Sequence, residues 1–120
     1  MEKKIISKNQ VSIAVFKSDE VLITDEQSAL DFLMSTLYND NCSHIVINKE
    51  ILCNDFFVLS TGIAGDILQK VVNYQMKIAI VGDYSNYESK PLNDFIYECN
   101  NGNSIFFVKD EEKAISKLVD

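Results

Sequence analysis

The sequence is poor in the residues that interrupt regular structure. Its 120 residues include one proline, Pro91, and four glycines, all of which are expected near the ends of secondary-structure elements. No internal repeat, linker or low-complexity tract divides the chain. A chain of this length can bury one hydrophobic core without disulfides or metal, so residues 1–120 are predicted to form a single domain.

Long apolar runs are also missing. Lys3 and Lys4 precede Ile5 and Ile6, but the polar residues 7–10 break this run long before a signal-peptide core could form. No apolar segment approaches the length that a bilayer requires. We therefore expect a soluble, cytoplasmic chain without a membrane partner.

The chain has no cluster of basic residues. It carries 11 basic and 18 acidic side chains, for a net charge of −7, whereas nucleic-acid binders usually present a basic face. DNA and RNA are therefore not expected as partners. Apolar residues make up 47% and charged residues 24% of the chain, which is the usage of an ordinary folded domain.

No complete metal motif is present. Cys42, Cys53 and Cys99 form an odd set without C-x-x-C spacing, and in a reducing compartment they are expected to be free thiols. The alternative is a metal site built from Cys42, His44 and Cys53, but a fourth ligand with zinc-like spacing is missing. We expect no metal and no cofactor.

Complete catalytic and nucleotide-binding motifs are absent as well. His44 is the only histidine and precedes its predicted strand, so it should lie at the opposite end of the sheet from Ser60 and Thr61. This placement argues against a Ser-His-Asp hydrolase. Gly62 and Gly65 belong to neither of the common glycine-rich phosphate-binding patterns, and we assign Gly65 to helix packing.

The first third of the sequence predicts β-structure. Residues 4–8 and 11–16, joined by a turn at Asn9 and Gln10, have the pattern of a β-hairpin. A short apolar segment, residues 21–23, predicts a third strand.

Helices and strands alternate in the rest of the chain. Thr24, with Gln27 three residues later, forms a capping box for a helix that runs to about Asn39. The later predicted strands span 45–47, 77–81 and 105–108, and a helical turn is predicted over 49–52. Apolar stripes predict helices over 63–72, 92–99 and 114–119. Ser89 with Pro91 signals the start of the second of these helices, and Asp110 signals the start of the third. The sequence therefore predicts an α/β fold, a β-rich start followed by α-β-α-β-α-β-α, in which a mixed sheet with parallel later strands carries packed helices.

Polar side chains gather in the loops that follow the parallel strands, where ligands and partners usually bind. The candidate binding residues are Asp55, Ser60, Thr61, Gly62, Asp83 and Tyr84. Ser60 or Thr61 is predicted to be the N-cap of the next helix, a hydroxyl that phosphorylation could switch, or both. Asp55 and Asp83 are either solvated loop residues or carboxylates of an active site. The neighbouring Phe56 and Phe57 are predicted to be core residues.

One segment, residues 55–95, resembles a bacterial family known as domain of unknown function 4180. The resemblance rests on DFF at 55–57, the TG and AG pairs within 61–65, QK at 69–70 and IVGDY at 80–84, and it extends more loosely from Val11 to the C-terminus. The family name implies no activity.

In topology the chain also resembles the sulfate-transporter and anti-sigma-factor antagonist (STAS) domains. These domains have a D-S-[ST]-G-type motif at the start of the second helix, and its serine is phosphorylated in the antagonist proteins. Ser60, Thr61 and Gly62 match the S-[ST]-G part, while Leu59 stands in place of the aspartate. The resemblance implies a regulatory module that binds a protein partner.

Two main functional hypotheses follow. The first is a non-enzymatic, STAS-like regulatory or protein-binding module that uses the loop before the second long helix and is switched by phosphorylation at Ser60 or Thr61. The second is a small-molecule or nucleotide-binding α/β domain with its site at the carboxyl ends of the parallel strands. Under this hypothesis the domain either only binds its ligand or is an enzyme. A purely structural subunit, which would present a large apolar dimer face, is a third hypothesis.

Overall fold

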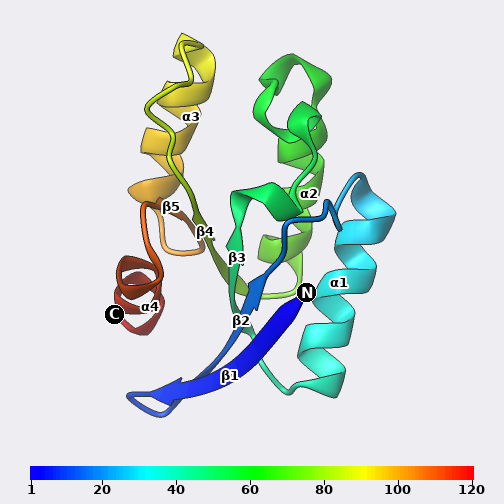
Figure 1. The fold of residues 1–120 in the computed structure, drawn as a ribbon, viewed down its shortest axis with the longest axis vertical. Helices are drawn as coiled ribbons and strands as arrows, with labels where there is room; N and C mark the ends of the chain where they lie inside the picture. The colour runs from blue at the N-terminus through cyan, green and yellow to red at the C-terminus, as the bar shows by residue number, and fades with distance from the viewer.

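A computed structural model describes all residues, 1–120. One mixed sheet of five strands, in the order β1-β2-β3-β4-β5, forms the centre of the molecule (Figure 1). The strands are β1 (Glu2–Lys8), β2 (Val11–Lys17), β3 (His44–Asn48), β4 (Lys77–Val81) and β5 (Ile105–Val108). β1 is antiparallel to β2, and every later pair is parallel. The predicted α/β class and mixed sheet are confirmed.

The strand order explains where the helices lie. Helices α1 (Glu26–Asn39), α2 (Ile63–Asn73) and α3 (Lys90–Asn100) each connect neighbouring parallel strands. Because the order always advances in one direction, right-handed connections place these three helices on the same face of the sheet. α4 (Glu111–Val119) follows the last strand and packs on the other face, where its Ala114 and Leu118 join Val15 and Val46 in a separate core. None of the helices is both long and apolar enough to cross a membrane.

The buried strands divide their side chains between two cores. In β3, Ile45 and Ile47 contribute to the larger core under α1–α3, while Val46 contributes to the smaller core under α4. Side chains alternate between the faces of a strand, so a strand covered on both faces must be apolar at consecutive positions. This is why the short run at 45–47 is a reliable strand signal.

The N-terminal hairpin has the two-residue turn that its sequence predicts. Asn9 and Gln10 both have positive φ, 54° and 67°, as a turn matched to the twist of a hairpin requires. Lys8 is paired with Val11, and β1 begins at Glu2, two residues before the predicted start.

Two local predictions in the following segment were wrong. The N-cap of α1 is Asp25, whose carboxylate accepts from the Ser28 amide at 2.8 Å, and the Thr24–Gln27 capping box does not form. Both residues before the helix carry a suitable oxygen, and the Asp25–Ser28 pair satisfies the reciprocal geometry one position later. The predicted strand at 21–23 is reduced to a single bridge between Ile23 and Leu52.

Candidate functional site at the carboxyl end of the sheet

The carboxyl ends of the parallel strands meet at one edge of the sheet, and the longest loop there follows β3. It consists of three short 3₁₀ turns, η1 (Lys49–Ile51), η2 (Asn54–Phe57) and η3 (Leu59–Thr61). The predicted helical turn at 49–52 corresponds to η1. In Figure 1 the segment rises beyond the end of β3 and then enters α2. We refer to residues 54–62 as the carboxyl-end loop.

Thr61 closes the carboxyl-end loop. Its Oγ1 lies 2.8 Å from the carbonyl oxygens of both Asp55 and Val58, to which the hydroxyl donates, and it accepts from the Ile63 amide at 3.3 Å. Thr61 therefore holds the turns of the loop together. The Asp55 side chain itself is exposed, in η2.

Neither Ser60 nor Thr61 is the N-cap of α2. Gly62 occupies that position, with φ of 77° and no side-chain cap, because the chain turns through a left-handed residue between η3 and the helix. The prediction that one of the hydroxyls caps the helix was therefore wrong. Ser60 is exposed. Gly65 is exposed, and a Cβ atom added to it would meet nothing within 4 Å, so helix packing does not explain this glycine.

Asp83 and Tyr84, which follow β4, are engaged within the chain. The Asp83 carboxylate accepts from the Ser85 hydroxyl at 2.6 Å and the Ser85 amide at 2.9 Å, and these bonds lower the pKa of Asp83. The hydroxyl of Tyr84 donates to the Ile80 carbonyl at 2.6 Å, and burial raises the pKa of Tyr84. Tyr84 thus fixes the β4–α3 loop to its strand.

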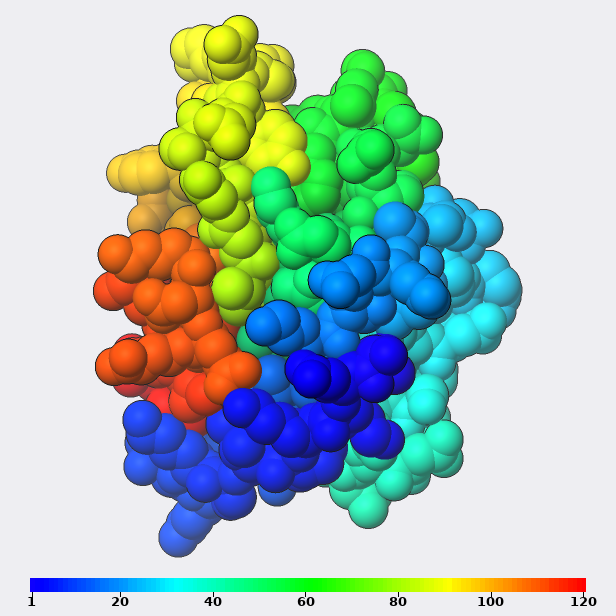
Figure 2. Space-filling view, in the orientation of Figure 1, coloured from blue at the N-terminus to red at the C-terminus, as the bar shows by residue number.

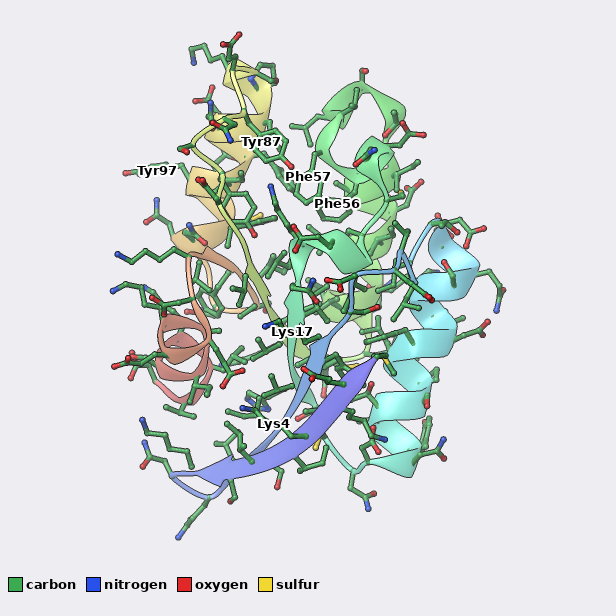
Figure 3. All side chains as sticks on the ribbon, in the orientation of Figure 1. Lys4, Lys17, Phe56, Phe57, Tyr87 and Tyr97 are labelled. Atoms are coloured by element: carbon green, nitrogen blue, oxygen red, sulfur yellow. The ribbon has the colours of Figure 1, made fainter.

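A group of rings fills the space between the two loops. We call it the aromatic cluster, and its members are Phe56, Phe57, Tyr84, Tyr87 and Phe107. Phe57 stacks on Tyr87 with centroids 5.2 Å apart, and Tyr84 meets Phe107 edge-on at 5.5 Å. Figure 3 shows Phe56, Phe57 and Tyr87 close together between the carboxyl-end loop and α3. The prediction that Phe56 and Phe57 are core residues is confirmed.

Lys49 lies across the cluster, and sequence reasoning missed it. Its Nζ donates to the Asp83 carbonyl at 3.0 Å and lies 5.0 Å from the centroid of the Tyr87 ring. This arrangement joins the loop after β3 to the loop after β4. Tyr87 was also missed. Two tyrosines three residues apart in an otherwise polar loop could have indicated that their rings pack together, as Tyr84 and Tyr87 do.

The structure divides the candidate residues into two groups. Asp55, Ser60, Thr61 and Gly62 belong to the carboxyl-end loop, while Asp83 and Tyr84 belong to the loop after β4. A hollow of about 290 Å³, open to solvent, lies at the edge of the aromatic cluster, where Phe57 and Tyr87 line it. Its lining residues are Asp19, Val21, Lys49, Glu50, Leu52, Asn54, Phe57 and Tyr87, so none of the candidates lines it.

Cys42, His44 and Cys53 do not come together as a metal site. No group of three or more His, Cys, Asp or Glu residues is arranged to hold a metal ion. Cys42 is buried, Cys53 and Cys99 are half-buried, and all three are free thiols. The His44 ring bonds to the neighbouring Ser43 hydroxyl at 3.1 Å.

The fold and this site define a small mixed α/β domain whose exposed polar loop lies over an aromatic core. Residues 8–118 match the family model described as "Domain of unknown function (DUF4180)", and the chain belongs to that family. No curated protein matches the sequence.

A solved structure described as the anti-sigma factor antagonist SpoIIAA in its unphosphorylated form is also similar to this chain. The match covers 98% of this chain and 97% of that chain, with 10% sequence identity and a TM-score of 0.41. The predicted resemblance to an anti-sigma factor antagonist is thus found.

Proposed function

We propose that this chain is a protein-binding regulatory module that docks its partner on the carboxyl-end loop. The observation that carries the proposal is that the aromatic cluster fills the place where a parallel sheet usually binds a small ligand. Small-molecule sites are concave and enclose most of the ligand. A filled crevice beneath a protruding loop suits a macromolecular partner better.

The loop offers both apolar and polar contacts. Val58 is 50% exposed at its outer side, and Ser60, Thr61 and Gly62 beside it are exposed as well. The bonds of the Thr61 hydroxyl and the backbone bond from the Val58 amide to the Asp55 carbonyl hold the loop in one shape. A preformed surface loses less conformational entropy on binding, which favours affinity.

Ser60 is the residue at which we propose phosphorylation to act. The hydroxyl of Thr61 is engaged with carbonyl groups, whereas Ser60 is exposed. A phosphate would add roughly two negative charges near Asp55 on a chain that is already acidic. Docking to an acidic or apolar partner surface would then weaken.

Site-directed photocrosslinking in the native host tests this proposal. We expect a photoreactive amino acid at Val58 to give a discrete crosslinked protein, which mass spectrometry identifies. The same amino acid at Tyr38 or Tyr97, which are 71% and 70% exposed on α1 and α3, should not capture that protein. Adding Ser60→Glu should reduce the yield at position 58, whereas Ser60→Ala should not.

Equal capture from all three positions, or none from position 58, would contradict the proposal. If Val58 captures a partner but Ser60→Glu has no effect, the docking part stands and the phosphorylation part is wrong. Mapping phosphate on Ser60 in protein purified from the native host provides a separate test of that second part.

The alternative function, binding of a small molecule, is favoured by a different hollow at the strand ends. It has a volume of about 300 Å³ between β2–β4 and the start of α4, which is at the low end for ligand sites. Val15, Val46 and Val81 contribute apolar walls, and Lys17 and Lys109 also line it. Asp110 and Glu111 line the hollow as well, so its charges balance. A largely apolar molecule with a polar group that the lysines can bind fits this lining.

A thermal-shift screen with nucleotides, sugar phosphates and fatty acids separates the two functions. A ligand bound only by the folded state raises the melting temperature, by an amount set by its concentration relative to its Kd. The alternative requires a rise that is lost in the Lys17→Ala/Lys109→Ala double variant. No rise with any compound argues for the protein-binding function.

A further inference from the structure

The two edges of the sheet differ in how they are closed. At the β5 edge, the Asn100 side chain accepts from the Phe107 amide at 2.7 Å and donates to the Phe107 carbonyl at 3.2 Å. Asn100 thus replaces the missing neighbour strand. β1 pairs only with β2, and no side chain bonds to its outer edge. Figure 2 shows β1, in dark blue, crossing the front of the molecule uncovered.

The hairpin turn determines which backbone groups of β1 face outward. Lys8 and Val11 flank a two-residue turn, so they form a hydrogen-bonded pair, and such pairs alternate along an antiparallel ladder. The N–H and C=O groups of Lys3, Ile5 and Ser7 therefore point away from β2. Unpaired groups in a row can bind another strand.

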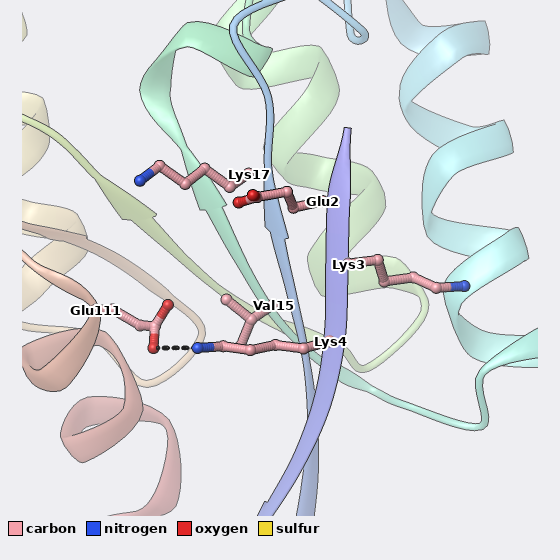
Figure 4. A pocket seen from close by; sticks show the side chains of 6 residues that line it. All are labelled: Glu2, Lys3, Lys4, Val15, Lys17 and Glu111. Carbon is pink, nitrogen blue, oxygen red and sulfur yellow. Dashed lines mark ion pairs between the residues drawn. The ribbon is translucent and has the colours of Figure 1, made fainter.

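Lysines on an edge strand usually keep other strands away, but here the two central lysines are neutralised. Lys3 pairs with Asp40 at the end of α1 at 2.9 Å, and Lys4 pairs with Glu111 of α4 at 3.0 Å. Figure 4 shows these two side chains leaving β1 toward opposite flanks. Ile5 follows them in the strand and is 47% exposed.

The charges at the ends of β1 are complementary for self-pairing. When two copies of β1 run antiparallel with Ile5 opposite Ile5, Glu2 of each copy lies opposite Lys8 of the other. Neither Glu2 nor Lys8 has an ion-pair partner within the chain. Lys3 then lies opposite Ser7, so every residue of the strand is paired.

Neighbouring registers are worse. Centring the two-fold axis on Lys4 places Glu2 opposite Ile6 and leaves Lys8 beyond the end of the partner's strand. Centring it on Ile6 places Glu2 opposite the hairpin turn and Lys8 opposite Lys4. Neither register places Glu2 opposite an unlike charge, and opposite charges that face each other across two strands stabilise the pair. The charge pattern therefore selects the register centred on Ile5.

We propose that two copies of this chain associate through the outer edge of β1, in the antiparallel register centred on Ile5, to form one continuous sheet. The outward N–H and C=O groups of Lys3, Ile5 and Ser7 bond across the axis. Two symmetric Glu2–Lys8 ion pairs fix the register. The carboxyl-end loop takes no part in this interface, so the proposal does not depend on the proposed function.

Sedimentation equilibrium over a dilution series tests the association. We expect a reversible monomer–dimer equilibrium that Glu2→Lys or Lys8→Glu each weakens by about tenfold or more, because each change replaces two symmetric attractions with repulsions. The double variant Glu2→Lys/Lys8→Glu should restore the wild-type Kd to within about threefold, since it exchanges the charges and keeps the pairs. Glu88→Lys, the same charge change on an exposed and unpaired residue, should leave the Kd unchanged.

Hydrogen exchange provides an independent readout of the same edge. The amides of Lys3, Ile5 and Ser7 should become protected as the protein concentration rises, and this protection should be lost in Glu2→Lys. A chain that is monomeric at all concentrations overturns the proposal. So does a dimer that Glu2→Lys leaves intact, a double variant that does not recover, or a dimer without protection of these amides, because the interface would then lie elsewhere.

Discussion

Replacing Phe56 by alanine is expected to lower the free energy of unfolding by about 3–5 kcal/mol, the usual cost of removing a buried phenylalanine ring. The side chain is fully buried, with its ring centroid 4.9 Å from that of Phe57 and 6.4 Å from that of Phe107. Alanine would leave a cavity among rings that the sheet and α2 hold in place. The melting temperature should fall by roughly 10–20 °C for a domain of this size.

Urea and thermal unfolding followed by circular dichroism measure this change. Val58→Ala is the matched control, because it shortens an apolar side chain of the same loop that is half exposed, and it should cost less than about 1 kcal/mol. Equal costs for the two variants, or a cost below about 1 kcal/mol for Phe56→Ala, would mean that the aromatic cluster does not carry the stability assigned to it.

The aromatic cluster also connects stability to the proposed function. Phe56 and Phe57 are consecutive residues of η2, and Val58 and the exposed hydroxyls follow them directly. The rings below the carboxyl-end loop therefore support the surface proposed to bind a partner. Stability at this end of the sheet and the shape of that surface depend on the same side chains.

The order of strands and helices was predictable because its signals are local and strong. The runs at 45–47, 77–81 and 105–108 are apolar at consecutive positions, as strands between two cores must be. Asp110 and Ser89 cap α4 and α3 as predicted, since each precedes its helix without a competing oxygen in the right position. The cap of α1 was missed because Thr24 and Asp25 are both good acceptors, and local sequence does not decide between them.

The candidate site was harder to predict because a polar residue in a loop can face either way. Tyr84 is among the predicted binding residues, but its hydroxyl turns inward to the Ile80 carbonyl. Thr61 is a predicted cap, yet its hydroxyl closes a turn six residues back at Asp55. Each choice depends on which carbonyl the folded chain brings within about 3 Å, and sequence spacing does not contain that information.

Asn48 is the clearest example of this difficulty. It follows the apolar run of β3 directly, among the polar residues at the strand ends, and the structure uses it to join two strands. Its side chain accepts from the Ser18 amide at 2.9 Å and donates to the Ser18 carbonyl at 2.7 Å. The backbone pairing of β2 with β3 ends before this point, at Val15 and Val46, so Asn48 continues the connection where the strands separate.

We expect Asn48→Ala to destabilise the fold by about 2–4 kcal/mol, because it leaves both backbone groups of the buried Ser18 without a partner. Asn48→Asp should also be destabilising, since it keeps an acceptor for the amide but places a carboxylate against the Ser18 carbonyl and near Glu50. The control is Asn93→Ala, which removes one exposed bond to the Tyr87 carbonyl and should cost less than about 1 kcal/mol. Hydrogen exchange of the Ser18 amide identifies the cause. This amide should lose its protection in Asn48→Ala and retain it in Asn93→Ala. An amide that exchanges at the wild-type rate in both variants would contradict this role and indicate that Asn48 instead serves a ligand.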